Sequence, residues 1–91
     1  MVIREIRIRN RHGLHLRPAS AVCEIALKYR CRSELVVGNK TYNLKSVLSV
    51  LSAQVTAQGL ILIRCDGADE ADAMEALAGA LTAAGPDTEN G

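Results

Sequence analysis

The residues that could do chemistry lie in one segment, residues 11–20, which reads RHGLHLRPAS. His15 is followed two positions later by Arg17, and Pro18 fits the first turn of a helix, where its missing N–H would have no partner. An imidazole nitrogen can accept a phosphoryl group, and the N–H groups of Leu16 and Arg17, with the Arg17 guanidinium, would stabilise the anionic product. A capping histidine beside a surface arginine is the alternative interpretation of the same residues.

Metal binding is a weaker interpretation of this segment. His12 and His15 have a His-x-x-His spacing, but no acidic or cysteine residue is adjacent, so we expect neither a metal nor a cofactor. The three cysteines show no Cys-x-x-Cys spacing, and their odd number does not suggest a disulfide framework. We therefore expect reduced, buried thiols.

The elements that must hold the segment follow from the apolar periodicity. Alternation predicts strands at residues 2–9, 33–37, 40–43 and 60–66, and helical spacing predicts helices at residues 16–30, 46–53 and 70–84. The pair Gly38 and Asn39 predicts a hairpin turn. The order βαββαβα indicates an α+β open sandwich, in which helices cover one face of a four-stranded antiparallel sheet.

Length and composition limit the alternatives. The 91 residues fit one domain, expected over residues 1–85, with a disordered tail at residues 86–91. Two Tyr with no Trp or Phe argue against nucleic-acid binding by base stacking. The longest apolar run, residues 60–63, is too short for membrane insertion, so we expect a cytoplasmic protein.

Charge is divided unevenly along the chain. Residues 1–45 hold ten Lys and Arg against three Glu, a balance of +7, whereas residues 46–91 hold one Arg against seven acids, a balance of −6. Such a division can mark a basic face for anionic partners, or it can reflect ordinary solvated surfaces.

Two motifs resemble those of a known family. The sequence GLHLRPA at residues 13–19 is similar to the active-site signature of HPr, the histidine-containing phosphocarrier family of the bacterial phosphoenolpyruvate-dependent phosphotransferase system. Residues 40–51, KTYNLKSVLSVL, resemble the family's regulatory-serine region, and residues 67–71 resemble the entry to its last helix. The similarity runs from about residue 2 to residue 84, and the fold it implies is the HPr open-faced β-sandwich.

The resemblance implies roles for individual residues. His15 would be phosphorylated by Enzyme I and dephosphorylated by enzyme IIA domains, with Arg17 neutralising the phosphoryl group, so the protein would be a carrier and not an enzyme. We expect Ser46 at the N-cap of the second helix. It would be modified by an HPr kinase/phosphorylase where the organism has one. The apolar residues after Ser46 could be ordinary core, but we expect an exposed docking surface beside the active histidine, near Leu14 and Leu16. The expected docking residues are Ser20, Val47, Leu48 and Leu51.

A regulatory binding module of the same fold is the rival interpretation. In it, phosphorylation of Ser46 would gate docking to a regulator and His15 would rarely be used. Retention of His15 with Arg17 and Pro18 favours the carrier.

Four positions depart from the family pattern. Leu16 replaces a small or hydroxyl residue, and Glu24 and Leu27 stand where Lys is frequent, which leaves the choice of partner and of the sugar or nitrogen-regulatory branch open. Gln54 replaces a glycine that closes the second helix, and glycine is the residue best able to adopt a left-handed cap.

Overall fold

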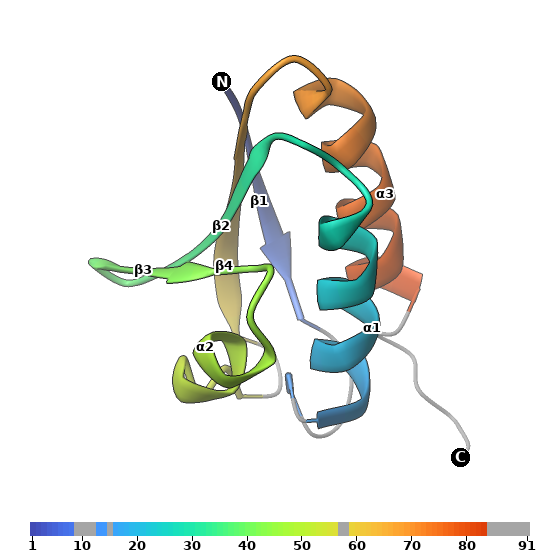
Figure 1. Cartoon of the computed structure of the whole chain (residues 1–91). Helices are drawn as coiled ribbons and strands as arrows, with labels where there is room; N and C mark the ends of the chain where they lie inside the picture. The colour runs from blue at the N-terminus through green and yellow to red at the C-terminus, as the bar shows by residue number, and fades with distance from the viewer. Residues whose placement is uncertain (9–12, 15, 57–58, 84–91) are drawn as a thin grey trace.

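The computed structural model describes residues 1–8, 13–14, 16–56 and 59–83. Seven elements follow one another along the chain (Figure 1): β1 (Val2–Arg7), α1 (Leu16–Leu27), β2 (Arg32–Val37), β3 (Lys40–Asn43), α2 (Val47–Ser52), β4 (Leu60–Asp66) and α3 (Glu70–Ala83). The order βαββαβα predicted from the sequence is confirmed. The predicted tail, residues 86–91, lies outside the described residues.

The four strands form one antiparallel sheet in the order β1-β4-β2-β3. Ile6 is paired with Ile61 across β1 and β4, and Leu35 with Ile63 across β2 and β4. All four side chains are buried, because alternate residues of each strand face the helices. The predicted hairpin turn is also present, with Gly38 at a φ of 63° between the last two paired residues of β2 and β3.

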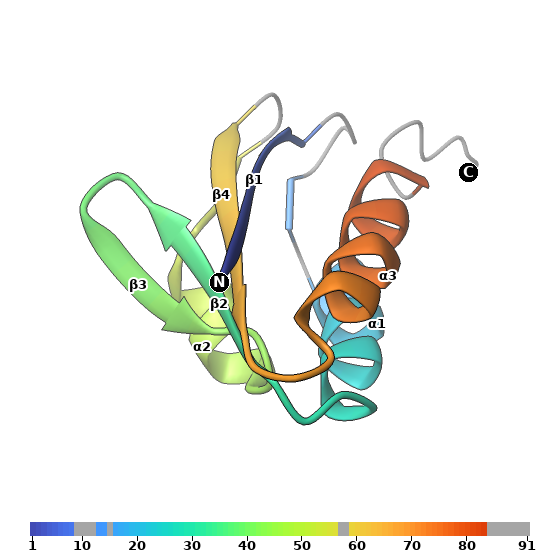
Figure 2. The ribbon, with the colours of Figure 1, turned by 90° about the horizontal axis from the view of Figure 1, so that it is seen from above.

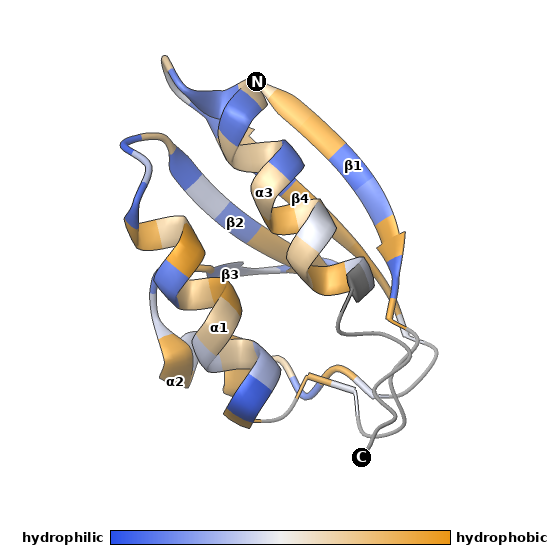
Figure 3. Ribbon diagram, turned by 90° about the vertical axis from the view of Figure 1, so that its right-hand side faces the viewer, coloured by the Kyte–Doolittle hydropathy of each residue, from blue (hydrophilic) through white to orange (hydrophobic). Residues whose placement is uncertain are grey.

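The sheet forms one layer, and α1 and α3 form a second layer beside it (Figure 2). The helices α1 and α3 lie side by side over one face of the sheet, and α2 lies beside the N-terminal part of α1 (Figures 1 and 3). The predicted α+β open-faced sandwich is therefore confirmed.

The helix α1 is shorter than predicted, since it ends at Leu27 and not at residue 30. The two residues after the helix bond to carbonyls three positions back, which tightens the chain into a turn. The next two N–H groups, those of Arg30 and Cys31, donate to the carboxylate of Asp69 at 2.8 and 2.9 Å. A distant side chain thus takes the donors that a longer helix would have used.

The first strand also ends earlier than predicted, at Arg7. Ile8 follows it as a buried residue whose N–H donates to the carbonyl of Gly59 at 2.8 Å. The predicted extension to residue 9 lies outside the described residues.

The three cysteines are free and buried, as predicted. Burial raises the pKa of the Cys65 thiol to about 11 and also raises that of Cys23. Reactivity requires the thiolate, so both thiols are poor nucleophiles at neutral pH.

Ion pairs join the basic and acidic halves of the chain. Arg4 contacts Glu75 at 2.8 Å, and Arg64 donates twice to Glu34, at 2.6 and 2.8 Å. The Arg4–Glu75 pair therefore balances a small part of the charge asymmetry within the fold, whereas the Arg64–Glu34 pair joins the one cation of the acidic half to an acid of the basic half. Within the described residues, no helix combines the length and apolar character needed to cross a membrane, and no three His, Cys, Asp or Glu side chains are grouped as metal ligands would be.

Candidate functional site

The N-terminal end of α1 is where the sequence places the chemistry. The helix begins at Leu16 and carries Pro18 in its first turn, as predicted, and no acidic residue occupies that turn. The N–H groups of a first helical turn have no partner within the helix, and the helix dipole is positive there. His15 and His12 lie outside the described residues, but the residues on either side of His15 are described. This end of α1 is therefore suited to a negatively charged group.

Arg17 is exposed at this end of the helix. Among the described residues, its guanidinium has no hydrogen bond or ion pair, whereas Arg4 and Arg64 are both paired with carboxylates. An arginine without an internal partner is available to an external anion, which it can bind with two parallel hydrogen bonds.

The residues before His15 are held by the backbone after α2. Gly13 has a φ of 69°, and the N–H of Leu14 donates to the carbonyl of Val55 at 3.0 Å. Leu14 is only 5% exposed, so it does not itself contribute to an exposed apolar surface. Its side chain joins the core, as does that of Val55.

Ser46 is the N-cap of α2, as predicted. Its backbone is extended (φ −124°, ψ 116°), and its Oγ accepts the N–H of Ser49 at 3.2 Å. The Oγ of Ser49 in turn accepts the N–H of Asn43 at 2.9 Å, which fixes the end of β3 to the first turn of α2. The Ser46 side chain is half-buried.

Apolar side chains remain exposed beside this end of α1. Leu16 is 62% exposed on α1 and Leu48 is 80% exposed on α2, so the prediction that part of the α2 apolar surface stays exposed is confirmed. Ser20, Val47 and Leu51 are partly exposed on the same two helices, which contact each other. These five residues are called the apolar patch below.

The remaining departures from the family pattern are all on the surface. Glu24 and Leu27 are exposed on α1, toward its C-terminal end. Gln54 is exposed and has a φ of 54°, the left-handed conformation for which glycine is best suited.

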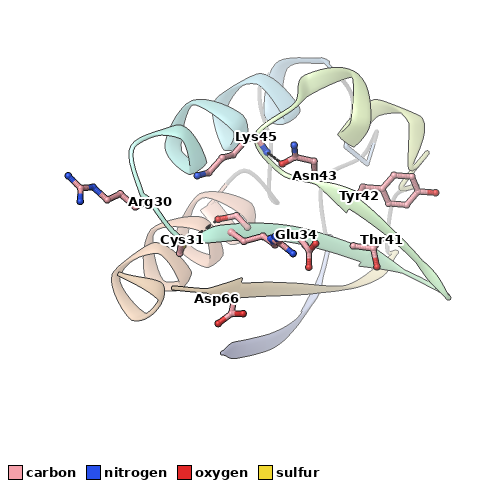
Figure 4. Close-up of a pocket in the computed structure, with 10 residues that line it drawn as sticks. Arg30, Cys31, Glu34, Thr41, Tyr42, Asn43, Lys45 and Asp66 are labelled. Carbon is pink, nitrogen blue, oxygen red and sulfur yellow. Dashed lines mark hydrogen bonds between the residues drawn. The ribbon is translucent and has the colours of Figure 1, made fainter. Parts of the chain in front are cut away.

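A pocket lined by described residues lies elsewhere. It measures about 800 Å³ and is found beyond the opposite, C-terminal end of α1. Its lining includes Arg30, Cys31, Glu34, Tyr42, Lys45 and Asp66. Figure 4 shows Arg30 and Asp66 pointing outward in different directions, so these charges do not converge on one position. The pocket is thus not part of the site predicted from the sequence.

Comparison with known proteins identifies the family. The family model described as "PTS HPr component phosphorylation site" matches residues 2–83. This chain belongs to the HPr family. HPr-family proteins are phosphocarriers of the phosphotransferase system and not enzymes, so the resemblance drawn from the two motifs is confirmed.

Solved structures agree with this assignment. An HPr of Thermoanaerobacter tengcongensis is 28% identical, with a TM-score of 0.91 over 98% of this chain and 100% of that one. The histidine-containing phosphocarrier protein of Mycoplasma is 26% identical, with a TM-score of 0.89 over 97% of this chain and 100% of that one. The Bacillus subtilis catabolite repression protein Crh, described as a swapped dimer, is 28% identical, with a TM-score of 0.75 over 91% and 95%.

Sequence reasoning missed the role of Val55 in this HPr-family chain. A backbone carbonyl acts here, and every residue type carries one, so the identity of residue 55 gave no signal. The available signal was Gly13, because a Cβ at that position would collide with the Val55 carbonyl oxygen and the Thr56 backbone.

Proposed function

We propose that this protein accepts a phosphoryl group on His15 from Enzyme I and passes it to enzyme IIA domains. The observation that carries the proposal is the exposed, unpartnered Arg17 among the described residues, in the acid-free first turn of the helix that follows His15. That end of the helix provides positive charge and backbone donors where a phosphorylated His15 would need them. The family membership supports the same chemistry.

The transfer we propose is a displacement at phosphorus. A lone pair on a neutral His15 ring nitrogen attacks the phosphoryl group carried by Enzyme I. A nitrogen–phosphorus bond forms on His15 while the bond to Enzyme I breaks and leaves its electron pair there. The second ring nitrogen of His15 keeps its proton. Arg17 and the N–H groups of Leu16 and Arg17 stabilise the phosphoryl oxygens, and a IIA domain repeats the displacement in the next step.

The apolar patch is the surface that we propose for docking. Leu16 and Leu48 expose most of their side chains beside the phosphorylation site, and exposed apolar groups of this kind mark protein contacts. Glu24 and Leu27 extend the exposed surface along α1 and are the positions at which partner choice would differ from that of other family members.

Ser46 is the site that we propose for regulation by an HPr kinase/phosphorylase. A phosphate there would sit at the positive end of α2 and adjacent to Val47 of the apolar patch. It would add about two negative charges to the docking surface without removing any core contact. The fold would remain, and docking would weaken.

The test of the carrier function is phosphorylation in solution. The protein is incubated with Enzyme I and phosphoenolpyruvate, and its intact mass is measured before and after mild acid. We expect one acid-labile phosphoryl group in the wild type and in His12→Ala, and none in His15→Ala. Label on His12, or an unchanged rate in His15→Ala, would contradict the proposal.

The regulatory module of the same fold remains the second candidate. The similarity to Crh, a catabolite repression protein, favours it. In that case His15 would carry little phosphoryl flux and Ser46 modification would control binding to a regulator. A wild type that Enzyme I does not phosphorylate, but that an HPr kinase does, would establish the module in place of the carrier.

A further inference from the structure

Two backbone hydrogen bonds tie the chain before α1 to the connection between α2 and β4. The N–H of Ile8 donates to the carbonyl of Gly59 at 2.8 Å, and the N–H of Leu14 donates to that of Val55 at 3.0 Å. The connection is itself closed by a bond from the Gly59 N–H to the Thr56 carbonyl at 3.0 Å. The residue immediately before His15 is thus fixed by an element about forty positions away in the chain.

The hydrogen bond from the Leu14 N–H to the Val55 carbonyl joins two tightly packed segments of the chain, and we call it the clasp. Both residues are buried, so neither the N–H nor the carbonyl could exchange its partner for bulk water without cost. Gly13 passes so close that a Cβ would lie 2.7 Å from the Thr56 carbonyl carbon. The clasp therefore allows little freedom in where Leu14 lies.

The direction of the Val55 carbonyl depends on the residue before it. α2 ends with Ala53 in a right-handed conformation (φ −70°, ψ −20°), and Gln54 then changes to a left-handed one (φ 54°). The N–H of Gln54 bonds to the Leu51 carbonyl at 3.1 Å. The Gln54 side chain is exposed and makes no hydrogen bond to another described residue. Its part in the structure is therefore carried by its backbone angles.

We propose that Gln54 is a positioning residue for phosphoryl transfer, because its left-handed backbone aims the Val55 carbonyl at Leu14 and so fixes the entry to α1. This rests on the proposed function, in which His15 is the phosphorylated residue. The clasp holds the chain on the N-terminal side of His15, and α1 holds it on the other. Together they limit the positions from which the imidazole can approach phosphorus. Misplacement by about 1 Å can slow such a reaction roughly a hundredfold.

The experiment uses substitutions that change the backbone preference of residue 54. Gln54→Val disfavours the left-handed conformation, because a β-branched side chain there is a steric outlier, whereas Gln54→Gly permits it freely. The amide exchange rate of Leu14, measured by NMR, reports the clasp directly. The kcat and KM for phosphorylation by Enzyme I report its consequence.

We expect Gln54→Val to speed exchange of the Leu14 amide and to lower kcat roughly tenfold, since the reacting ring is no longer well placed. KM should stay unchanged, because α1 and α2, which carry the apolar patch, are not altered. Gln54→Gly should keep the slow exchange and the full kcat, as the conservative replacement that rescues the backbone angle. A loss of stability alone would not lower kcat at temperatures where every variant is folded.

A second variant keeps the proposal testable if Gln54→Val does not fold. An ester in place of the amide at residue 14 removes only the Leu14 N–H. It is made by joining a synthetic segment of residues 1–30 to a segment beginning at Cys31, where the sequence already supplies the cysteine for ligation. The same fall in kcat at constant KM is expected.

Two results overturn the proposal and leave the proposed function intact. One is slow Leu14 exchange in Gln54→Val, which would show that residue 54 does not set the clasp. The other is an unchanged kcat in the ester variant or in a Gln54→Val protein with fast exchange, which would show that the clasp does not position His15. A wild type without phosphorylation at His15 would remove the proposed function, and this proposal with it.

Discussion

The two ends of α1 differ in how their polar groups are satisfied. At the C-terminal end, the Asp69 carboxylate accepts the N–H groups of Arg30 and Cys31, and the Lys45 ammonium donates to the Tyr29 carbonyl at 2.8 Å. At the N-terminal end no acidic residue lies within the first turn itself, and no bond of Arg17 is found within the described part of the chain.

The comparison shows how one helix serves both stability and function. The Asp69 and Lys45 side chains bond to the backbone of the turn after the C-terminal end, so these backbone groups already have partners. The described bond that holds the other end, the clasp, uses backbone atoms alone, and none of the described residues pairs with the Arg17 guanidinium there. Substitutions at each end can separate these two arrangements.

Gly13→Ala should break the N-terminal arrangement most severely. A left-handed φ costs a non-glycine residue about 1–2 kcal/mol, and overpacking adds about 1–3 kcal/mol, so we expect a loss of about 3 kcal/mol in the free energy of unfolding. The added Cβ would meet the Val55 carbonyl oxygen and the Thr56 backbone, neither of which can rotate away. Urea denaturation measures the loss.

Two glycines with open surroundings provide the controls. Gly38 has a φ of 63° with nothing within 4 Å of an added Cβ, so Gly38→Ala measures the backbone cost alone, about 1 kcal/mol. Gly79 is in α3 with equally open space, and Gly79→Ala should stabilise the protein by about 0.5–1 kcal/mol. Equal losses at Gly13 and Gly38 would mean that the contact with Val55 and Thr56 contributes nothing.

Arg17→Ala should slow phosphoryl transfer without unfolding the protein. Hydrogen bonds to charged groups contribute about 1.5–3 kcal/mol, which corresponds to a slowing of roughly tenfold to a hundredfold. Arg30→Ala is the matched control, because it removes an exposed arginine from the turn that follows the C-terminal end of α1. Rapid-quench kinetics with phosphorylated Enzyme I would distinguish the two variants. Similar slowing in both would point to net charge and not to a role at the site.

The sequence predicted the elements well because their apolar periods are clear. Pro18 located the start of α1, Gly38 with Asn39 located the hairpin, and Ser46 located the start of α2. The end of α1 was wrong by three residues because Asp69, far away in the chain, accepts the N–H groups that follow the helix. No pattern in the sequence around residue 30 reveals that a side chain so far away in the chain accepts these hydrogen bonds.

The candidate site was predictable in part. The residue types around Arg17 indicated anion chemistry, and the structure leaves Arg17 exposed, but the burial of Leu14 was not foreseen. Leu14 is held by a hydrogen bond from its N–H to the Val55 carbonyl, which involves backbone atoms alone. Residue types report poorly on contacts made by the main chain.

Ser46→Asp should slow phosphorylation of His15 by about fivefold. The added negative charge would repel a charge of the same sign on the partner, and repulsion between two unit charges close together in water costs about 1 kcal/mol. The thermal midpoint should not fall, since an acid at the N-cap of α2 is favourable. Thr41→Asp is the control, because it adds the same charge to an exposed residue of β3. A Ser46→Asp protein that is phosphorylated as fast as the wild type would leave Ser46 as a helix cap only.

The smallest effect is expected at the C-terminal end of α1, from Asp69→Asn. The pKa of the Asp69 carboxyl lies below its ordinary value of 3.8, chiefly because the Arg30 N–H bonds to the ionised form. A lowered pKa contributes stability above the ordinary value, and that contribution is lost as the pH falls through the pKa of the folded state. The wild type should therefore be more stable than Asp69→Asn at pH 7, and this difference should shrink as the pH falls below the ordinary value of 3.8 and through the pKa of the folded state.

Asp72→Asn is the control for this comparison, because it removes the same charge from the first turn of α3 without removing a hydrogen bond to the turn after α1. Thermal midpoints measured from pH 2 to pH 7 would show whether Asp69→Asn, and not Asp72→Asn, loses the part of the stability that depends on pH. Phosphorylation of His15 should be unchanged in both variants, since the first turn of α1 does not depend on this carboxylate. Slower transfer in Asp69→Asn would show that the two ends of the helix are coupled, and that the clasp alone does not set the N-terminal end.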